Sequence, residues 1–510
     1  MRGWPGAHSV GAAGTEGETV DGEPTVWSRF EVAAQRFPDN LAVVDERYRL
    51  TYRELYGLAL ALGGWLREAG ASGNVGLLLP NGAGFFVGFL GVVSVPATCV
   101  PMNLLLTPGE LARLLEHAQV ETVLTARPLA ERLPETLPNV VCLDELLPTL
   151  LGRAGSPAPP PSLPGADDVA AIVYTSGTSA DPKGVMLSHR NFASNVAGFE
   201  QVLDLDDHHV VLGVLPTFHC FALTVTVLLP LFIGAAAVQV RKFSPAALLQ
   251  AAERYRVSVL PAVPGIFAAL LRWREATRYD LSALELCISG AEALPRPVSE
   301  AFAERFGRRI IQGYGLTECS PVVSVNPPHD PRPETVGLPL PGLEVEVHGP
   351  EGEVPAGEVG EVVARGPSVM VGYYRAPEAT REAIDEEGWL HTGDLGYFDD
   401  QGHLVLAGRR KELIIVGGEN VFPGEVEQVL SAHPAVALAA VVGVKDPLRG
   451  EVPWAYVTLE PGAEVAETEL RQYCRQRLAP FKVPREVRVR ESLPVGLTGK
   501  VLKRRLLEDE

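Results

Sequence analysis

The sequence predicts an α/β protein with one large N-terminal region and a small C-terminal domain. Apolar, strand-like runs alternate with helix-like runs up to about Asn326, and this alternation is typical of largely parallel sheets covered by helices. This sequence pattern changes after about Pro339 and again after Gly408. A chain of 510 residues with 46% hydrophobic residues is too long for one compact core. About two to four domains or subdomains are therefore expected.

The chain begins with a segment that has no folding signal. Residues 1–25 are rich in glycine and acidic side chains and lack the apolar run of a signal peptide, so we expect a disordered extension. The next clear signal is a helix after Thr51, because Thr51 and Glu54 have capping-box spacing and apolar residues then recur at helical intervals. Gly70 supplies a stop, and a buried strand is expected over residues 75–79.

Later segments divide the chain. Residues 152–165 have the sequence GRAGSPAPPPSLPG, and this density of proline predicts a surface linker without helix or central strand. From about Pro339, short β-like runs separated by Gly-Pro and Glu-Gly turns predict a small β subdomain. The remainder, from Gly408 to Glu510, has roughly a hundred residues, which is enough for a compact domain.

Residues 221–240 form a run of twenty residues without a charge. That length meets the threshold for a transmembrane helix. Pro230 and Gly234 interrupt the run, however, and three of its side chains are polar. We therefore expect a buried helix, a turn and a buried strand. If this segment also has a function, its helix would line a tunnel for an apolar substrate.

Charge and cysteine content exclude several classes of function. Acidic residues outnumber basic ones by 63 to 44, the net charge is −19, and no basic groove of the kind that binds nucleic acid is evident. The six cysteines are scattered, with no C-x-x-C pair and no histidine cluster nearby. This pattern argues against a disulfide framework and a zinc site, and a reducing, cytoplasmic location is expected.

The loop 174–184 is the first candidate binding site. It follows the apolar run 169–173 and has the sequence YTSGTSADPKG. Hydroxyl groups, exposed backbone N–H groups and a lysine are the donors that a triphosphate requires. Lys183 is followed by Gly-Val, whereas a Walker A motif ends in Gly-Lys-Ser or Gly-Lys-Thr. Residues 185–187 look like a second strand before a helix that Ser188 caps, so we expect the loop to join two strands as a hairpin-like flap.

Five segments together resemble one family. The loop TSGTSADPKG is similar to the phosphate loop of the adenylate-forming superfamily, which comprises acyl-CoA synthetases, peptide-synthetase adenylation domains and luciferases. Four further segments match the same family in the same order: Gly313-Tyr314-Gly315-Leu316-Thr317-Glu318, Thr392-Gly393-Asp394, Gly408-Arg409-Arg410-Lys411-Glu412-Leu413-Ile414 and Thr498-Gly499-Lys500. Five ordered matches are far more specific than any single one.

The resemblance implies a fold and a division of the chain. An N-terminal AMP-binding domain, residues 26–408, would hold two α/β sheets packed with helices and a small β subdomain. A hinge at residues 409–411 would then lead to a small, mobile α+β domain at residues 412–510. The first 25 residues would lie outside both domains.

The resemblance also implies a reaction in two steps. A carboxylate attacks the α-phosphorus of ATP, which gives an acyl-adenylate and pyrophosphate, and the thiol of coenzyme A then displaces AMP. The residues implied in ATP and AMP binding are Thr175, Ser176, Gly177, Thr178, Ser179, Lys183, Gly290, Ala291, Glu292, Gly313, Tyr314, Gly315, Thr317, Asp394, Arg409 and Lys500. The residues implied in catalysis are Lys500, Glu318, Thr317 and His219.

Each implied role matches the chemistry of its residue. Lys183 and the loop hydroxyls would hold the β- and γ-phosphates, and Glu318 with Thr178 would ligate the Mg²⁺ that offsets their charge. Tyr314 would pack on adenine, and Asp394 would accept from the ribose hydroxyls. Taken alone, an acid after Thr-Gly is also a common turn residue, and Glu318 could be a solvated side chain. The ordered context favours the functional interpretation.

The C-terminal domain would supply the catalytic lysine. Lys500 would bridge the carboxylate and the α-phosphate, where negative charge gathers in the transition state. The family then swings this domain about a hinge residue, here Lys411, to admit the thiol. Gly417, Gly418 and Glu419 would line the path of coenzyme A.

The acid is expected to be apolar. Residues 218–221, FHCF, resemble the family's aromatic segment, where a ring gates the substrate carboxylate, although His219 could equally be a satisfied core histidine. We see no acid in the following run that could pair with an amino group, so a fatty acid fits better than an amino acid. The portion PTFHCFALTVTVLLPLFIGA is most similar to bacterial medium- or long-chain fatty acid–CoA ligases and related acyl-carrier-protein synthetases.

The acceptor stays open between coenzyme A and an acyl carrier protein. Basic residues are dense near the C-terminus and could meet coenzyme A phosphates or an acidic carrier, although a solvated charged face explains most of them equally well. These residues are Arg475, Arg477, Lys482, Arg485, Arg488, Arg490, Lys503, Arg504 and Arg505. A non-catalytic nucleotide or acyl sensor is disfavoured because Lys183, Glu318 and Lys500 are all present. Visits to a membrane surface and a homodimer also stay open.

One position departs from the family pattern. Ala180 stands where a glycine is usual in the phosphate loop. If this position requires a positive φ, alanine costs about 1 kcal/mol there. Flap mobility or nucleotide affinity would then differ from that of the relatives.

Overall fold

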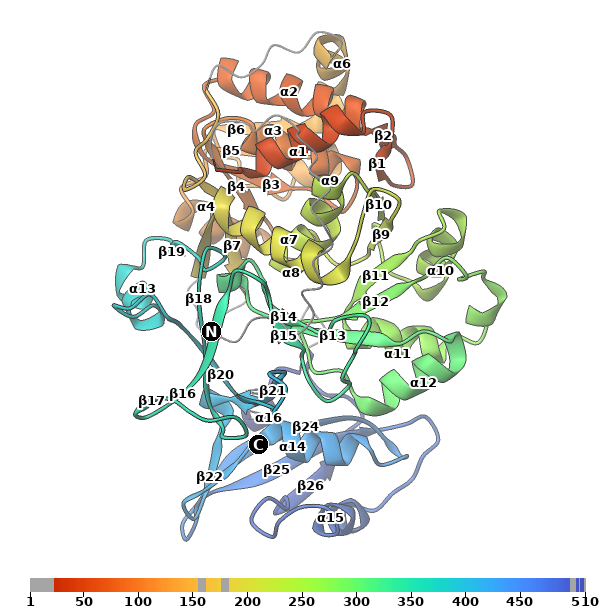
Figure 1. The fold of residues 1–510 in the computed structure, drawn as a ribbon, viewed down its shortest axis with the longest axis vertical. Helices are drawn as coiled ribbons and strands as arrows, with labels where there is room; N and C mark the ends of the chain where they lie inside the picture. Colours follow the sequence, from red (N-terminus) through yellow and green to blue (C-terminus); the bar gives the residue numbers. More distant parts are fainter. Residues whose placement is uncertain (1–22, 155–161, 176–182, 496–500, 504, 509–510) are drawn as a thin grey trace.

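The computed structural model describes residues 23–154, 162–175, 183–495, 501–503 and 505–508. Two large sheets with helices around them form most of the N-terminal part, a small β-sheet follows, and a further sheet with helices forms the C-terminal part (Figure 1). The predicted α/β class is therefore confirmed. Most of the expected extension lies outside the described residues, but its last residue, Thr25, is buried and caps the first helix.

The first large sheet carries parallel strands through its centre. In spatial order it comprises β15 (Leu338–Pro339), β14 (Val322–Val325), β13 (Ile310–Gly315), β12 (Leu286–Ser289), β11 (Val259–Ala262), β9 (Val210–Gly213), β10 (Ala236–Gln239), β1 (Leu41–Val44) and β2 (Arg49–Thr51). Between these strands the chain forms α10 (Pro245–Arg254), α11 (Pro264–Arg272) and α12 (Arg296–Phe306), with a short 3-10 turn η2 (Ala276–Arg278). The carboxyl ends of the neighbouring strands β11, β12 and β13 meet at one edge, where α/β sheets commonly bind ligands.

The second large sheet ends in an antiparallel hairpin. Its spatial order is β19 (Gly372–Tyr373), β8 (Lys183–Ser188), β7 (Val169–Thr175), β4 (Ala97–Pro101), β3 (Gly73–Leu78), β5 (Thr122–Thr125) and β6 (Asn139–Cys142). The strands from β7 to β6 are parallel, whereas β8 runs antiparallel to both of its neighbours. The associated helices are α2 (Tyr52–Glu68), α3 (Ala83–Val93), α4 (Pro108–His117), α5 (Arg127–Ala130) and α6 (Leu143–Ala154).

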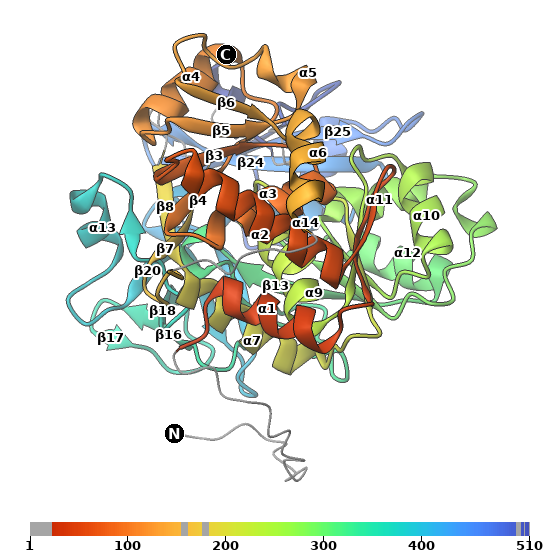
Figure 2. The same cartoon turned by 90° about the horizontal axis from the view of Figure 1, so that it is seen from above.

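Local signals in the sequence set several of these boundaries. Thr51 caps α2 through the predicted capping box with Glu54, and Gly70, at φ 72°, follows its end. The helices α1 (Val26–Arg36), α2 and α3 pack side by side (Figure 2). The predicted linker is wrong at its start, because α6 continues to Ala154 even though Pro148 lies inside it. The proline-dense residues 155–161 lie outside the described residues.

The uncharged segment 221–240 folds as a buried helix, a turn and a strand, as predicted. It contains α8 (Cys220–Ala222), a π-helical turn η1 (Leu223–Leu228), α9 (Leu229–Ile233), the left-handed Gly234 and β10. Its polar side chains are all hydrogen-bonded inside the protein: Thr224 to the Ser320 carbonyl, Thr226 to the Ala222 carbonyl and Gln239 to the Thr226 carbonyl. In the part of the chain that the structure describes, no helix combines the length and apolarity of a membrane span.

A long helix joins the two large sheets. The helix α7 (His189–Leu203) begins at Ser188, whose side chain forms a capping box with Asn191. It contacts β8 of the second sheet and β14 of the first, and its apolar face belongs to a hydrophobic core that spans both sheets. Residues on α7 therefore reach elements that carry different parts of the site.

The small β-sheet and the C-terminal part follow in sequence. The small sheet is antiparallel and comprises β17 (Gly352–Glu353), β16 (Glu344–Gly349), β18 (Gly360–Arg365), β20 (Leu390–Phe398) and β21 (Leu404–Arg409), and α13 (Pro377–Ala383) lies in the connection from β19 to β20. The C-terminal elements are β22 (Ile414–Val416), β23 (Glu419–Val421), α14 (Pro423–Ser431), β24 (Val436–Asp446), β25 (Gly450–Leu459), α15 (Glu467–Arg475), β26 (Glu486–Val489) and α16 (Arg505–Glu508). This last sheet has a hydrophobic cluster of its own.

Candidate active site

The phosphate loop lies at the turn of the β7–β8 hairpin. The two strands pair in antiparallel register, with Thr175 opposite Lys183, so the predicted hairpin is confirmed. Ser176, Gly177, Thr178, Ser179 and Ala180 lie outside the described residues. Thr175 and Lys183 therefore mark the base of the loop.

A tyrosine connects the loop lysine to the candidate metal ligand. The Lys183 ammonium lies 5.2 Å from the centroid of the Tyr373 ring. The Tyr373 hydroxyl donates a hydrogen bond of 2.8 Å to Oε1 of Glu318. Burial, and then the Glu318 charge, raise the pKa of the Tyr373 phenol, which keeps its proton on the oxygen. The structure thus brings Lys183 and Glu318 to one place.

Sequence reasoning missed Tyr373. Its strand β19 is two residues long and pairs with β8, the strand of Lys183. The tyrosine and Glu318 are 55 residues apart in the chain. The only local signal is a Gly-Tyr-Tyr run, which nothing in the sequence ties to the loop.

Glu318 lies on a turn that α7 holds in place. The turn η3 (Thr317–Cys319) follows β13. The buried Asn195 side chain donates to the carbonyls of Cys319 at 3.0 Å and Val322 at 2.7 Å, and accepts from the Val322 N–H at 3.2 Å. Thr224, on the π-helical turn, donates to the next carbonyl, that of Ser320. The backbone beside Glu318 is therefore fixed by side chains from two helical elements.

The candidate adenine segments meet at the carboxyl edge of the first sheet. Gly290, Ala291 and Glu292 follow β12 directly, and Gly313 to Gly315 end the neighbouring parallel strand β13. Ala291 adopts a positive φ of 69°, which is unusual for a residue with a side chain. A Cβ on Gly315 would lie 2.1 Å from the Pro321 carbonyl oxygen, so only glycine fits there. The predicted proximity of these segments agrees with the geometry.

Asp394 lies between a tyrosine and an arginine. The Tyr314 hydroxyl donates to Oδ2 of Asp394 at 2.7 Å, and Nε of Arg409 lies 3.0 Å from Oδ1. The Asp394 side chain is 9% exposed, whereas that of Arg409 is 55% exposed. Burial, and then Asp394, raise the pKa of Tyr314. One hydrogen bond and one ion pair therefore join Tyr314, Asp394 and Arg409, which come from three strands.

The aromatic segment lies beside the adenine segment. An added Cβ on Gly290 would be 3.1 Å from the Phe221 ring. The His219 and Phe218 rings have centroids 4.3 Å apart. Burial lowers the pKa of His219 to about 4, so its imidazole is neutral near pH 7. A neutral imidazole can donate or accept a hydrogen bond without adding charge.

The candidate hinge lies between two sheets. Arg409 is the last residue of β21 in the small sheet, and the exposed Lys411 lies in the turn η4 (Arg410–Glu412) before β22. Gly417 and Gly418, at φ 62° and 93°, form the exposed corner between β22 and β23. Lys500 lies outside the described residues.

Many C-terminal basic residues have acidic partners within the chain. The ion pairs join Lys482 to Glu425, Arg485 to Asp446, Arg488 to Glu486, and Lys503 to Glu412 and Glu427. Arg477 covers the ring of Tyr473. Arg504 lies outside the described residues. These pairs offset much of the positive charge that the sequence suggested for this region.

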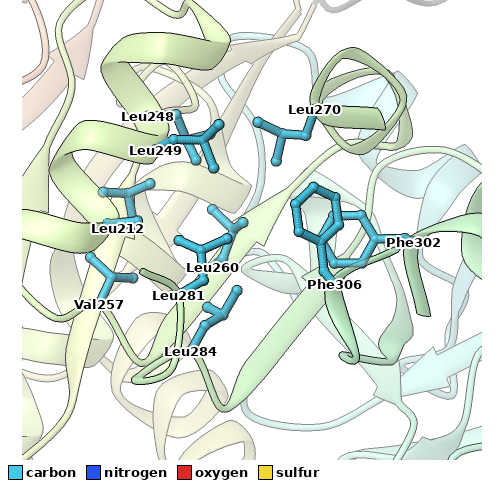
Figure 3. A pocket seen from close by; sticks show the side chains of 11 residues that line it. Leu212, Leu248, Leu249, Val257, Leu260, Leu270, Leu281, Leu284, Phe302 and Phe306 are labelled. Atoms are coloured by element: carbon cyan, nitrogen blue, oxygen red, sulfur yellow. The ribbon is translucent and has the colours of Figure 1, made fainter. Parts of the chain in front are cut away.

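Two hollows are lined by parts of the fold other than the uncharged helix. An apolar cavity of about 10 Å³ lies among leucines and phenylalanines of the first sheet and α10 to α12 (Figure 3), which is less room than an acyl chain requires. A larger hollow of about 390 Å³ lies between α7 and residues 340–343. Neither of these hollows in the described part of the chain is lined by residues 221–233, so the predicted tunnel stays a prediction.

Comparison with known proteins gives the family. Residues 30–374 match the family described as AMP-binding enzyme, and residues 425–500 match its C-terminal domain. A long-chain-fatty-acid–CoA ligase of Bacillus subtilis (strain 168) is 33% identical over 95% of this chain and 94% of its own length. A sulfoacetate–CoA ligase of Cupriavidus necator is 37% identical over 97% of this chain and 99% of its own length.

A solved structure agrees with these relatives. ATP-bound MatB from Rhodopseudomonas palustris superposes with a TM-score of 0.87 at 30% identity, over 95% of this chain and 99% of its own. The ordered motifs of the site agree with both family models, with the named relatives and with the shared fold. The chain therefore belongs to the AMP-binding enzyme family of adenylate-forming proteins and is an AMP-forming CoA ligase that uses ATP.

Proposed function

We propose that this ligase activates a fatty acid. The observation that supports this substrate class is the position of the uncharged helical segment, residues 220–233. Phe221 of this segment packs against Gly290 beside the candidate adenine segment, so a carboxylate held at the nucleotide would extend its tail toward apolar side chains. Burial of a methylene group is favourable by about 0.8 kcal/mol, which favours a hydrocarbon tail there.

Other acids of the family fit this segment less well. The relative named for sulfoacetate acts on a small acid with a second anionic group. A sulfonate calls for a basic side chain or several strong donors. Residues 220–233 contain no Lys or Arg, and the neighbouring His219 is neutral near pH 7 because burial lowers its pKa to about 4.

In the first step the chain's cations and donors stabilise charge on the phosphates. Lys183 and the loop hydroxyls would hold the leaving pyrophosphate, and Lys500 would meet the charge shared by the carboxylate and the α-phosphate. Asp394 would fix the ribose while Tyr314 and Arg409 hold its carboxylate. His219 would contact the substrate carboxylate as a neutral donor.

Glu318 fits the requirements of a magnesium ligand. Mg²⁺ prefers oxygen ligands and is commonly held by one or two carboxylates together with substrate phosphates, whose charge it offsets. The Glu318 carboxylate lies next to the ring that contacts Lys183, and Thr178 would add a hydroxyl from the loop. The residues present therefore fit a Mg²⁺ that accompanies ATP.

In the second step coenzyme A would displace AMP. We propose residues 409–411 as the hinge, with Lys411 as the residue that changes conformation and residues 412–510 as the mobile domain. Gly417, Gly418 and Glu419 would line the path of the thiol. The internal ion pairs of the C-terminal basic residues leave less charge for the phosphates of coenzyme A and for an acidic carrier protein alike. The relatives named as CoA ligases support coenzyme A as the acceptor.

The substrate assignment can be tested by measuring AMP and pyrophosphate release from ATP. The acids to compare are fatty acids of increasing chain length, sulfoacetate and 4-coumarate, each with and without coenzyme A. We expect turnover to rise with chain length to an optimum and to require coenzyme A. Turnover with sulfoacetate but with no fatty acid would overturn the proposal, and adenylate accumulation despite coenzyme A would indicate another acceptor.

The division of labour between the two lysines has a separate test. Lys500→Ala should abolish adenylate formation yet largely retain thioester formation from supplied acyl-adenylate, because the lysine acts only where the α-phosphate is attacked. Each half-reaction is followed by quenched-flow measurement of its product. Equal loss of both half-reactions would contradict the proposed swing of the domain.

A further inference from the structure

Tyr373 contacts both charged residues of the phosphate site. Its hydroxyl donates to Oε1 of Glu318 at 2.8 Å, and its ring faces the ammonium of Lys183, which lies 5.2 Å from the ring centroid. The side chain is half-buried, so both contacts are partly shielded from water. One uncharged residue therefore lies between a candidate phosphate ligand and a candidate metal ligand.

The backbone around Tyr373 makes the same connection. The Met370 N–H donates to the Glu318 carbonyl at 2.8 Å, and the Tyr374 N–H donates to the Gly184 carbonyl at 2.8 Å. Tyr373 itself pairs with Val185 across the β19–β8 ladder. The segment 370–374 is thus bonded at one end to the Glu318 turn and at the other to the strand that carries Lys183.

Two opposite charges that contact the same side chain have a simpler alternative arrangement. A lysine and a glutamate that are free to meet form an ion pair, in which each charge is already neutralised before the nucleotide arrives. A phenol satisfies one carboxylate oxygen without supplying charge, and an aromatic face attracts an ammonium without neutralising it. Tyr373 provides both contacts at once.

From this geometry we propose that Tyr373 is a positioning residue, which holds Glu318 for the cation and Lys183 for the phosphates and keeps the two from pairing. The inference rests on the proposed function, because it takes Glu318 as the metal ligand and Lys183 as a phosphate ligand. It assigns separate duties to two parts of one side chain. The hydroxyl acts on the metal site, and the ring acts on the phosphate site.

Two substitutions separate these duties. Tyr373→Phe keeps the ring and removes the hydroxyl, whereas Tyr373→Leu removes both. The readouts are Mn²⁺ binding in the presence of a non-hydrolysable ATP analogue, by electron paramagnetic resonance, and pyrophosphate binding without metal, by calorimetry. We expect Tyr373→Phe to weaken Mn²⁺ binding about tenfold while pyrophosphate affinity is kept, and Tyr373→Leu to weaken both.

The matched control is Tyr374→Phe. The Tyr374 hydroxyl bonds to Gln119 and Asn74, away from Glu318, so its loss should leave Mn²⁺ affinity unchanged. Unchanged Mn²⁺ affinity in Tyr373→Phe would overturn the inference. Equal losses of Mn²⁺ and pyrophosphate affinity in Tyr373→Phe, together with a lower melting temperature, would also overturn it, because they would indicate a merely structural role.

Glu318→Gln distinguishes this inference from its premise. If Glu318→Gln loses Mn²⁺ binding but Tyr373→Phe does not, the proposed metal ligand stands and the role of Tyr373 is wrong. If Glu318→Gln retains Mn²⁺ binding, the metal assignment itself is wrong and the inference falls with it. Loss in both variants, with Tyr374→Phe unaffected, supports both.

Discussion

Two neighbouring side chains orient the carboxylate of Asp394, the proposed ribose ligand. Its carboxylate accepts from the Tyr314 hydroxyl with one oxygen and pairs with Arg409 through the other. Each carboxylate oxygen can accept more than one hydrogen bond, so these partners orient the group and leave acceptor capacity for a ribose. The nearly complete burial of the Asp394 side chain strengthens both the hydrogen bond and the ion pair.

Asp394→Asn should raise the ATP KM by about tenfold or more, because charge-assisted hydrogen bonds are worth about 1.5–3 kcal/mol. Initial rates at varied ATP, with the acid and coenzyme A saturating, measure this effect. Asp399→Asn is the matched control, since Asp399 lies in the turn after β20 and accepts from the N–H groups of Gln401 and His403, which asparagine can also bind. Its carboxylate pairs with Arg332, which is not a predicted nucleotide ligand. A similar rise in both variants would contradict a specific role for Asp394.

At the scale of elements, α7 organises the site without contributing a predicted ligand. Asn191 donates to the carbonyls of Pro367 and Val369, and Asn195 holds those of Cys319 and Val322. One helix therefore fixes both the segment that leads to β19 and the turn that carries Glu318. The spacing of four residues places the two asparagines on the same face.

Asn195→Ala should lower the free energy of unfolding by about 2–4 kcal/mol, because two buried carbonyls and one N–H lose their partner. Urea denaturation followed by circular dichroism measures the change. Ser194→Ala on the same helix is the control and should change stability by less than about 0.5 kcal/mol, because Ser194 borders the hollow beside α7. A loss below about 1 kcal/mol in Asn195→Ala would contradict the proposed clamp.

Sequence patterns predicted the elements better than their connections. The capping box of α2, the hairpin of the phosphate loop and the breaks in the uncharged segment are local signals, and the structure has each of them. The contacts of Asn195 and Tyr373 span 127 and 55 residues, and no local pattern encodes such a partner. The end of α6 was missed because α6 packs against α2, and such tertiary contacts override an unfavourable local composition.

At the scale of the whole molecule, buried histidines set a dependence of stability on pH. His189 is fully buried and accepts from the Val26 N–H, which joins α7 to α1. Burial lowers the pKa of His189 and of His219 to about 4 from the usual 6.5. Between these values the unfolded chain binds protons that the folded chain excludes, so stability falls as the pH drops.

We expect the free energy of unfolding to be fully retained above about pH 6.5 and to decrease toward pH 4, by about 3 kcal/mol for each histidine at the lower end. Urea titrations at several pH values measure the slope. His189→Gln should make this slope shallower, because the variant no longer excludes the proton that His189 would bind in the unfolded chain. His208→Gln, at a side chain that is 86% exposed, should leave the slope unchanged, and an unaltered slope in His189→Gln would refute the assignment.

The ion pair between Asp394 and Arg409 has a consequence for communication across the enzyme. Arg409 is both a partner of the proposed ribose ligand and the first residue of the proposed hinge, and the two residues face each other across neighbouring strands. Binding of the nucleotide and the orientation of the C-terminal domain are then thermodynamically linked. By reciprocity, a domain orientation that has a higher affinity for the nucleotide must become more populated when the nucleotide binds.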